Sequence, residues 1–520
     1  MKEDKKFSYL FYNAVTYAGV MLSLVTATVE AFLFALDFFD HGKNLYLGLF
    51  TYMLLPGLLI FGLALIPIGV LWKKSRIRRG LPTFELRRFR IDLSLSHHRN
   101  ALLVFIVGTS LFVLMSLVGA YKAFHYTESV QFCGVLCHQV MNPEFTTYSK
   151  SPHGRVKCVE CHIGAGADWY MHSKLSGTRQ VFKVLTHSYE TPIKTPVKDL
   201  RPAEDTCKQC HWPGKYFGTM DLKRSYFLTE GDNPKWKLRM LLNVGGGQQN
   251  HGIHAHMNLD RDIYYAAEDE QRQKITWVKS IDKDGKEAIF VSPGSRWKNE
   301  APPQKAIRKM DCIDCHNRPT HQFDPPYRLI NEAMQTGAIN ADIPAIKEKA
   351  MEVLSKKYAT TPEAVRSIGE SLKNFYKTKH PDYYASHEKE LGQAIQQLIV
   401  MYQHNMFPEM KVRWDTHPEN IGHLATPGCF RCHDGEHRSV EAKVTPPPDL
   451  PAGGGLIPSG SKKSDGGVIS KDCKACHLIV EQGPAGAVEK NIEGLEFRHP
   501  VDIGNDWKET NCSDCHSGGA

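Results

Sequence analysis

The sequence predicts a mainly α-helical protein with much irregular structure, in which N-terminal transmembrane helices precede a cysteine- and histidine-rich domain with a small β-hairpin region. Three long apolar stretches fall within the first 121 residues, and all 14 cysteines recur in one pattern with a histidine. The 520 residues exceed one compact core, which indicates several domains. A hydrophobic fraction of 42% with 10% aromatic residues excludes a mostly disordered chain.

The apolar stretches cover residues 12–36, 45–72 and 101–121. At about 1.5 Å per residue, even the shortest is a helix of roughly 30 Å, enough to cross the hydrocarbon layer. The first stretch is too long for a signal peptide, whose apolar region has only about 7–15 residues. We therefore expect residues 1–121 to form a membrane anchor with three transmembrane helices.

Charge predicts the orientation of this anchor. The loop between the second and third stretches has nine basic residues against two acidic ones, a net +7 that accounts for nearly all of the chain's +8. Such a loop marks the cytoplasmic side of a bacterial inner membrane. The N-terminus is then also cytoplasmic, and the third helix delivers the cysteine-rich part to the periplasm. Because the positive charge is juxtamembrane, a nucleic-acid partner is not expected.

The cysteine pattern is Cys-x-x-Cys-His, the haem c attachment signature, in which two thiols bond the porphyrin and the histidine binds its iron. Six copies are regular and a seventh has one extra spacer residue. They are Cys133–Cys137–His138 (the longer copy), Cys158–Cys161–His162, Cys207–Cys210–His211, Cys312–Cys315–His316, Cys429–Cys432–His433, Cys473–Cys476–His477 and Cys512–Cys515–His516. A zinc ribbon does not need a histidine after each second cysteine. The pattern predicts seven haem c groups in a haem-packed multihaem cytochrome c domain, facing the periplasm where thioether attachment takes place.

The rest of the chain divides around these motifs. We expect haems one to three in residues 122–218, a β-containing segment with haem four at 219–326, a haem-free helical segment at 327–410, and haems five to seven at 411–520. Residues 275–280 and 287–292 flank Asp-Lys-Asp-Gly, which predicts a β-hairpin. Apolar spacing predicts helices near 345–357, 362–377 and 388–406. Residues 445–467 are rich in Pro, Gly and Ser and predict a loop.

From Cys133 onward the chain resembles the NapC/NirT/NrfH family of membrane-anchored quinol dehydrogenases. The resemblance rests on Cys-His-Gln-Val-Met-Asn-Pro at 137–143, Tyr-Ser-Lys-Ser-Pro-His at 148–153, the motif at 158–162, Asp168-Trp169 and residues 174–182. Residues 315–321, 420–423 and 499–502 are similar to a long heptahaem branch, the ImcH-type inner-membrane cytochromes. Short members of the family usually have one span, whereas this chain has three predicted spans and a longer spacer in its first motif, so its membrane contact is expected to differ.

The resemblance implies a quinol dehydrogenase that passes electrons from a menaquinol-type quinol in the membrane to periplasmic c-type cytochromes, in anaerobic or extracellular respiration. Membrane lipid and a second copy of the chain are further expected partners. Two alternatives stay open from the residues. One is a terminal reductase with an open haem site for a small molecule, and the other is a passive electron wire within a larger complex.

Seven of the 25 histidines are proximal ligands, which leaves 18 as candidates for the distal positions. We expect the distal ligands to be His153, His254, His321, His423, His437 and His499, with His256 as the alternative to His254. A distal histidine gives a saturated iron suited to electron transfer.

The first haem and the quinol site follow from the resemblance. Met141 is expected near the first iron, either as a thioether ligand or as a packing residue. Lys174 matches the lysine of the family's quinol site, and Gln180 stands where the family has an acid. Because an amide cannot take a proton, Asp168, Glu144 or His172 is expected to substitute for that acid.

Overall fold

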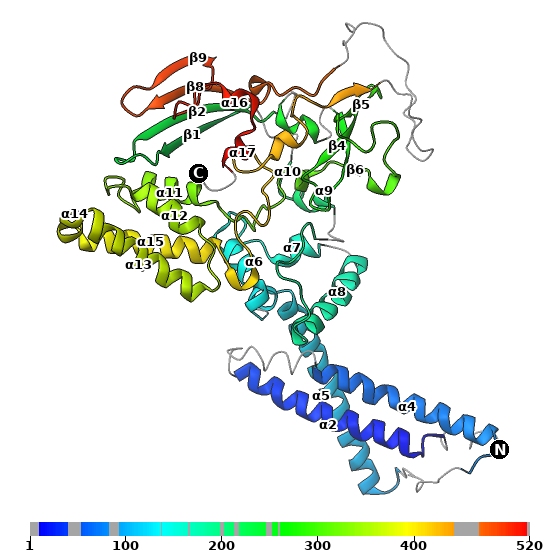
Figure 1. Cartoon of the computed structure of the whole chain (residues 1–520). Helices are drawn as coiled ribbons and strands as arrows, with labels where there is room; N and C mark the ends of the chain where they lie inside the picture. Colours follow the sequence, from blue (N-terminus) through cyan, green and yellow to red (C-terminus); the bar gives the residue numbers. More distant parts are fainter. Residues whose placement is uncertain are drawn as a thin grey trace. The chain divides into compact units, whose positions relative to one another are not determined.

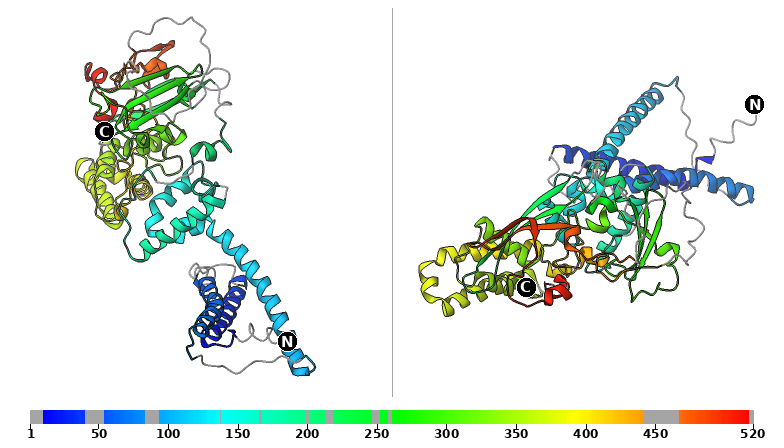
Figure 2. Two further views of the ribbon diagram at one scale, coloured as in Figure 1. Left: turned by 90° about the vertical axis from the view of Figure 1, so that its right-hand side faces the viewer. Right: turned by 90° about the horizontal axis from the view of Figure 1, so that it is seen from above.

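The computed structural model consists of two compact units, Met1–Leu136 and Cys137–Ala520, and each is described by itself. The residues that the structure describes are 10–39, 54–82, 93–136, 138–164, 167–197, 202–212, 218–245, 252–257, 261–440 and 467–516. The segment expected to be a Pro/Gly/Ser-rich loop, 445–467, lies almost wholly outside them. Figures 1 and 2 show the course of the chain within each unit.

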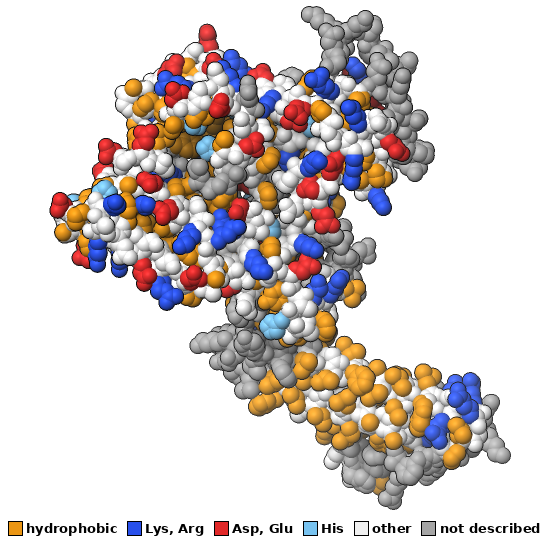
Figure 3. All heavy atoms as spheres, viewed as in Figure 1, with side chains coloured by type: hydrophobic (Ala, Val, Ile, Leu, Met, Phe, Trp, Pro, Cys, Tyr) orange, Lys and Arg blue, Asp and Glu red, His pale blue; other side chains and the backbone are white. Residues whose placement is uncertain are grey.

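The first unit contains the helices α2 (Ala14–Phe39), α4 (Leu55–Arg78) and α5 (Ser96–Thr127), followed by the π-helical turn η2 (Gln131–Leu136). All three α-helices are long and apolar enough to cross a membrane. Their large apolar side chains are mostly exposed, and Figure 3 shows hydrophobic side chains covering the face of these helices that is in view. The expected three spans are confirmed as helices, although α4 and α5 continue beyond 72 and 121, to Arg78 and Thr127.

A seam of small residues brings α2 and α4 together as an antiparallel pair. A Cβ atom on Gly19 would lie 2.8 Å from the carbonyl oxygen of Gly62, and one on Gly69 would overlap the side chain of Thr16. Small residues of this kind let two membrane helices approach closely. At the end of the seam, the buried Lys73 donates from Nζ to the Tyr12 carbonyl oxygen at 2.8 Å.

The second unit starts with short helices joined by irregular chain: α6 (His138–Lys150), α7 (Cys158–His162), α8 (Ala167–Leu185) and α9 (Ala203–Cys207). It ends with α16 (Asp506–Glu509) and α17 (Cys512–His516). Four of these six helices have five residues or fewer. Because such lengths gain little from helix propagation, the local structure here depends on tertiary contacts.

Two antiparallel sheets lie in this unit (Figure 1). One has the order β1-β2-β8-β9, so that a hairpin from the C-terminal part of the chain extends a hairpin formed much earlier. The other has the order β6-β3-β4-β5-β7. The bounds are β1 Thr219–Phe227, β2 Lys235–Asn243, β3 Arg261–Ala267, β4 Ile275–Asp282, β5 Glu287–Val291, β6 Arg308–Lys309, β7 Arg438–Val440, β8 His477–Pro484 and β9 Glu489–Leu495.

The five-stranded sheet buries both of its faces. Tyr265 and Val278 pack in a cluster on one face, whereas Ala266, Trp277 and Trp297 belong to a second cluster. This alternation follows the two-residue period of a strand. The predicted hairpin is confirmed as β4–β5, but the expectation of only a small β-hairpin region was wrong, because pairing between distant segments builds two sheets.

The haem-free segment is helical, as expected. It contains α11 (Pro326–Thr336), α12 (Ile346–Ser355), α13 (Thr361–Lys379), α14 (Pro381–Ser386) and α15 (Glu388–Asn405). Three of these match the predicted helices within a few residues. Their apolar faces meet in the largest core of the described residues, where Ile330, Ile368 and Leu398 have no exposed surface.

Candidate functional site

Six of the seven Cys/His motifs sit on a single turn of helix. α7, α10 (Cys312–Cys315) and α17 contain both cysteines of their motif, and α9 ends at the first cysteine of another. The turns η7 (Gly428–Arg431) and η8 (Cys473–Ala475) carry the fifth and sixth motifs. One turn places residues i and i+3 on the same side, which presents both thiols to one ligand. None of the cysteines in the described residues forms a disulfide.

The first motif differs in local structure as well as in spacing. Cys133 lies in η2, a π-helical turn that is wider than an α-helical one. Its longer spacer therefore coincides with a wider turn. Cys137 and the side chain of His138 lie outside the described residues.

Each of the other six motif histidines has one further imidazole beside it. The distances between ring centres are 6.2 Å for His162–His321, 5.9 Å for His211–His153, 6.5 Å for His316–His254, 5.9 Å for His433–His256, 6.2 Å for His477–His423 and 6.2 Å for His516–His499. A metal held between two imidazoles needs two bonds of about 2 Å plus about 1 Å from each nitrogen to its ring centre, or roughly 6 Å in all. The six pairs are spaced as two axial ligands of one iron would be.

Hydrogen bonds orient several of these rings. Nδ1 of His321 lies 3.0 Å from the Glu144 carbonyl oxygen, and Nδ1 of His256 lies 2.6 Å from the Ile253 carbonyl oxygen. Nδ1 of His433 lies 2.9 Å from the Ser470 carbonyl oxygen. A carbonyl oxygen can only accept, so Nδ1 carries the proton and Nε2 keeps its lone pair for a metal. His499 makes the same contact with the Val501 carbonyl oxygen at 2.7 Å.

Two-residue sets of this kind suit a porphyrin, which supplies the other four ligands itself. Among the described residues, no group of three or more His, Cys, Asp or Glu side chains is placed to hold a bare metal ion. Burial lowers the pKa of His321 to about 4, with the nearby His162 as a second cause. A low pKa keeps an imidazole neutral and able to bind a metal at neutral pH.

Five of the six expected distal histidines lie beside a motif histidine. The sixth, His437, has no motif histidine paired with it among the described residues; its buried ring is hydrogen bonded through Nδ1 to the Asp434 carboxylate at 2.9 Å, and its role as a ligand stays a prediction. The ring beside His433 is His256, which the sequence suggested only as an alternative to His254. His254 and His256 each lie beside a motif histidine, because the 3₁₀ turn η4 (Ile253–His256) directs the two rings to two different motifs.

From the second motif on, successive motifs also lie close to one another in the order of the sequence. α7 packs against α9, and α9 packs against α10. The guanidinium of Arg431 in the fifth motif donates to the Asp314 carbonyl oxygen in the fourth at 2.7 Å. The ring of Phe430, in the fifth motif, stacks at 4.2 Å on the ring of His423, which is paired with His477 of the sixth motif. Burial raises the pKa of Cys512 in the seventh motif, and Cys473 of the sixth contributes to this shift.

The structure places only part of the expected quinol site. Met141 is half-buried on α6, Lys174 is half-buried on α8, and the exposed Gln180 donates from Nε2 to Ser176 Oγ at 3.3 Å. The side chains of Asp168 and His172 lie outside the described residues. Burial raises the pKa of Glu144, an effect that the charge of Arg318 opposes.

A family model matches one region of this chain, and one known protein matches nearly its whole length. A family model described as the NapC/NirT cytochrome c family, N-terminal region, matches residues 95–212, which include the first three motifs. The cytochrome c-type protein ImcH of Geobacter sulfurreducens is 38% identical over 523 residues, covering 99% of this chain and 97% of that protein. The chain belongs to the NapC/NirT family of membrane cytochromes c. Membership of this family implies covalently bound haem c and a role in electron transport.

A shorter member of the NapC/NirT family matches only one part of the chain. The cytochrome c-type protein NrfH of Wolinella succinogenes is 32% identical over 115 residues, which are 22% of this chain and 63% of NrfH. No solved structure matches the chain. The family features are thus shared with short members in one region and with the long ImcH over the whole chain.

Proposed function

We propose that this protein is an inner-membrane heptahaem cytochrome c that oxidises a menaquinol-type quinol and passes the electrons to periplasmic c-type cytochromes. Each haem c, when bound, supplies a one-electron redox centre. The seven Cys/His motifs would attach seven such groups. The observation that carries the proposal is the set of six imidazole pairs, each spaced for one iron.

These pairs favour electron transfer over catalysis at an open iron. Two histidines of the protein would complete the ligands of each haem iron, so no position would be left for a small-molecule substrate. The pairs that would each hold one haem iron are His162 with His321, His211 with His153, His316 with His254, His433 with His256, His477 with His423 and His516 with His499. A terminal reductase would need one site with a free position, and none of these six pairs leaves one.

The contacts between motifs support a route in sequence order. The third motif touches the second and the fourth through α9, and Arg431 joins the fourth to the fifth. Cofactors attached to touching motifs are held close together, as one-electron transfer requires. We therefore propose that electrons enter at the first motif, next to the membrane anchor in the sequence, and leave near the seventh.

The quinol site belongs beside the first motif. We propose that Lys174 binds the quinol hydroxyl group and that Met141 supplies a thioether next to the first iron. Gln180 stands on the same helix as Lys174 and can only hydrogen bond, so the proton acceptor is Asp168, Glu144 or His172. Oxidation of a quinol releases two protons, and a periplasmic acceptor would release them outside.

A quinol-reduction assay tests this proposal. Full-length protein in detergent is mixed with a reduced menaquinol analogue, and haem reduction is followed by absorbance. Lys174→Ala is expected to slow the quinol-dependent reduction at least tenfold while reduction by dithionite is unchanged. Lys183→Ala is the matched control. Lys183 lies nine residues after Lys174 on the same helix, which is about two and a half turns, so its side chain points to the opposite side.

Two results would contradict the proposal. Equal rates for Lys174→Ala and the parent protein would remove Lys174 from the quinol site. A parent protein with seven haems that no quinol analogue reduces would be the passive wire of a larger complex.

A further inference from the structure

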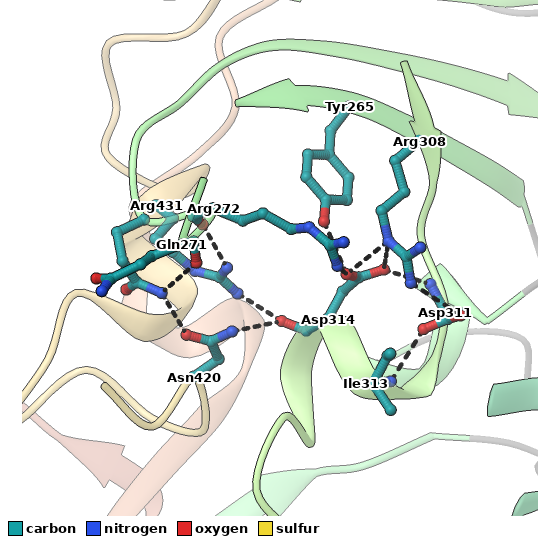
Figure 4. Close-up of polar contacts among 10 residues, drawn as sticks. Tyr265, Gln271, Arg272, Arg308, Asp311, Ile313, Asp314, Asn420 and Arg431 are labelled. Atoms are coloured by element: carbon teal, nitrogen blue, oxygen red, sulfur yellow. Dashed lines mark hydrogen bonds and ion pairs between the residues drawn. The ribbon is translucent and has the colours of Figure 1, made fainter. Parts of the chain in front are cut away.

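A buried cluster of charged residues joins the fourth and fifth motifs (Figure 4). Its centre is Asp314, which is 3% exposed and directly precedes Cys315. One carboxylate oxygen accepts from the hydroxyl group of Tyr265 at 2.7 Å and from Nε of Arg308 at 2.9 Å. Arg272 lies 3.4 Å from the same oxygen. The negative charge of Asp314 is thus fully matched by its neighbours.

Arg431 is held in a different way. It directly precedes Cys432 and is only 8% exposed. Its Nε, Nη1 and Nη2 atoms donate to the carbonyl oxygens of Gly428, Arg272 and Asp314, at 2.9, 2.9 and 2.7 Å. No carboxylate in the described part of the chain is within salt-bridge distance of this guanidinium. Arg431 therefore keeps a positive charge that only backbone dipoles solvate.

The balance of the cluster leaves this charge in place. Arg308 also pairs with Asp311 at 3.0 Å, so three guanidinium groups face two carboxylates. The other nearby carboxylate, Asp434, is hydrogen bonded to His437. One net positive charge remains, and it belongs to Arg431. A buried charge of this kind is screened much less by salt than an exposed one.

The position of this charge relates it to two cofactor sites at once. Arg431 lies between the two cysteines of the fifth motif, and its Nη2 hydrogen bond reaches the residue between the two cysteines of the fourth. The same two sites share the turn η4, since His254 faces His316 and His256 faces His433. Asn420 adds a second bond to the Asp314 carbonyl oxygen, from Nδ2 at 3.0 Å.

We infer that Arg431 is a positioning residue that holds the fourth and fifth haem sites together and raises the reduction potentials of both. This inference rests on the proposed attachment of haem at these two motifs. A fixed positive charge stabilises the reduced form of a nearby centre, because reduction adds an electron. Arg431 thereby makes the fourth and fifth haems, in the middle of the route, easier to reduce. Asp314 limits the rise in potential because its carboxylate neutralises the charge of neighbouring arginines.

A redox titration of substituted full-length proteins tests the inference. Arg431→Gln is expected to shift two of the midpoints to lower values, by about tenfold in the reduction equilibrium, which is about 59 mV for one electron. Arg431→Lys retains the positive charge and should leave both midpoints close to those of the parent protein. Asp314→Asn removes a negative charge and is expected to shift the same two midpoints upward.

Arg438→Gln is the control, since this arginine lies close by in the sequence but is exposed on β7. It removes the same charge and should leave all midpoints in place. If Arg431→Gln does not accumulate with its full haem content, the unchanged midpoints expected of Arg431→Lys and the upward shift expected of Asp314→Asn still decide the question. Midpoints that do not move in Arg431→Gln or Asp314→Asn proteins with full haem content would overturn the inference.

The outcomes for this inference and for the proposed function can be told apart. Unmoved midpoints together with normal reduction by quinol refute only the role of Arg431. Shifted midpoints in a protein that quinol does not reduce refute only the quinol proposal. A pyridine haemochrome count that does not fall by two when the cysteines of these two motifs are replaced refutes the sites themselves.

Discussion

Residues 326–405 and the segments that carry the Cys/His motifs bury their side chains in different ways. In the helical segment, Ile330, Ile368 and Leu398 have no exposed surface, and they pack against other apolar side chains. In the motif segments, cysteines such as Cys161, Cys210 and Cys473 are exposed, and the paired imidazoles face one another across about 6 Å.

From this difference we expect the polypeptide to complete its own core in the helical segment, and haem to complete the core in the motif segments. The helical segment gains its stability from apolar area removed from water. The motif segments have short helices and half-exposed thiols, so we expect most of the area that they bury to lie against haem. Haem attached through thioether bonds stays on the chain in the folded and in the unfolded state, so it stabilises the folded state through the contacts that it makes only there. The two regions should therefore respond differently to loss of haem and to substitutions in the helical core.

The largest effect is expected when the chain is made in cells that cannot attach haem. Amides around the motifs should exchange in the fastest phase of hydrogen–deuterium exchange, with opening free energies close to zero. Amides in α12, α13 and α15 should keep their protection, because their core contains only protein side chains. The haem-loaded protein is the control, and equal protection of both regions without haem would contradict the comparison.

A core substitution should have the converse effect. Leu398→Ala removes a side chain with no exposed surface and should lower the free energy of unfolding of the helical segment by about 2–5 kcal/mol. The haem midpoints should not change. Thermal unfolding followed by circular dichroism measures the first effect, and a redox titration measures the second. The exposed Gln397→Ala on the same helix is the control, and an equal loss of stability in both variants would argue against a protein-only core here.

Lys347 should make the stability of the helical segment depend on pH. This lysine is 4% exposed and donates from Nζ to Asn331 Oδ1 at 3.1 Å. Burial lowers its pKa to about 7. Between pH 7 and about 10.5 the unfolded chain binds a proton that the folded chain does not, so the free energy of unfolding rises with pH.

Lys347→Met should remove this dependence. The variant is expected to be more stable than the parent by on the order of 3 kcal/mol at pH 6, and the gain should fall toward zero at pH 10. Asn331 still accepts from the Phe227 backbone N–H at 2.9 Å in its absence. Denaturant unfolding at several pH values measures the change. The exposed Lys357→Met serves as the control, and a gain that does not vary with pH would show that Lys347 is not the titrating group.

The smallest effect concerns a single axial ligand. His256→Ala should convert one low-spin centre, about one seventh of the haem, to a high-spin form visible by electron paramagnetic resonance. His437→Ala removes a buried histidine of the same region and should leave all centres low-spin. A high-spin signal from His437→Ala, with none from His256→Ala, would restore the ligand set expected from sequence alone.

Patterns that are local in sequence predicted the structure well. The apolar length of the three stretches predicted α2, α4 and α5, and the helical period predicted α12, α13 and α15. The Asp-Lys-Asp-Gly turn predicted the β4–β5 hairpin. The four-stranded sheet could not be predicted in this way, because its strand β2 pairs with β8 across more than two hundred residues. No short segment contains both partners of such a pairing.

The sequence by itself determined the attachment chemistry, since a Cys-x-x-Cys-His motif needs only one turn of chain to present two thiols and a histidine. It could not determine which second histidine belongs to which motif. His153 precedes His162 closely in the chain but lies beside His211, whereas His162 lies beside the distant His321. Only tertiary packing brings such residues together, and it also places the Arg431 guanidinium on the Asp314 carbonyl oxygen, because contacts between distant segments depend on the path of the whole chain.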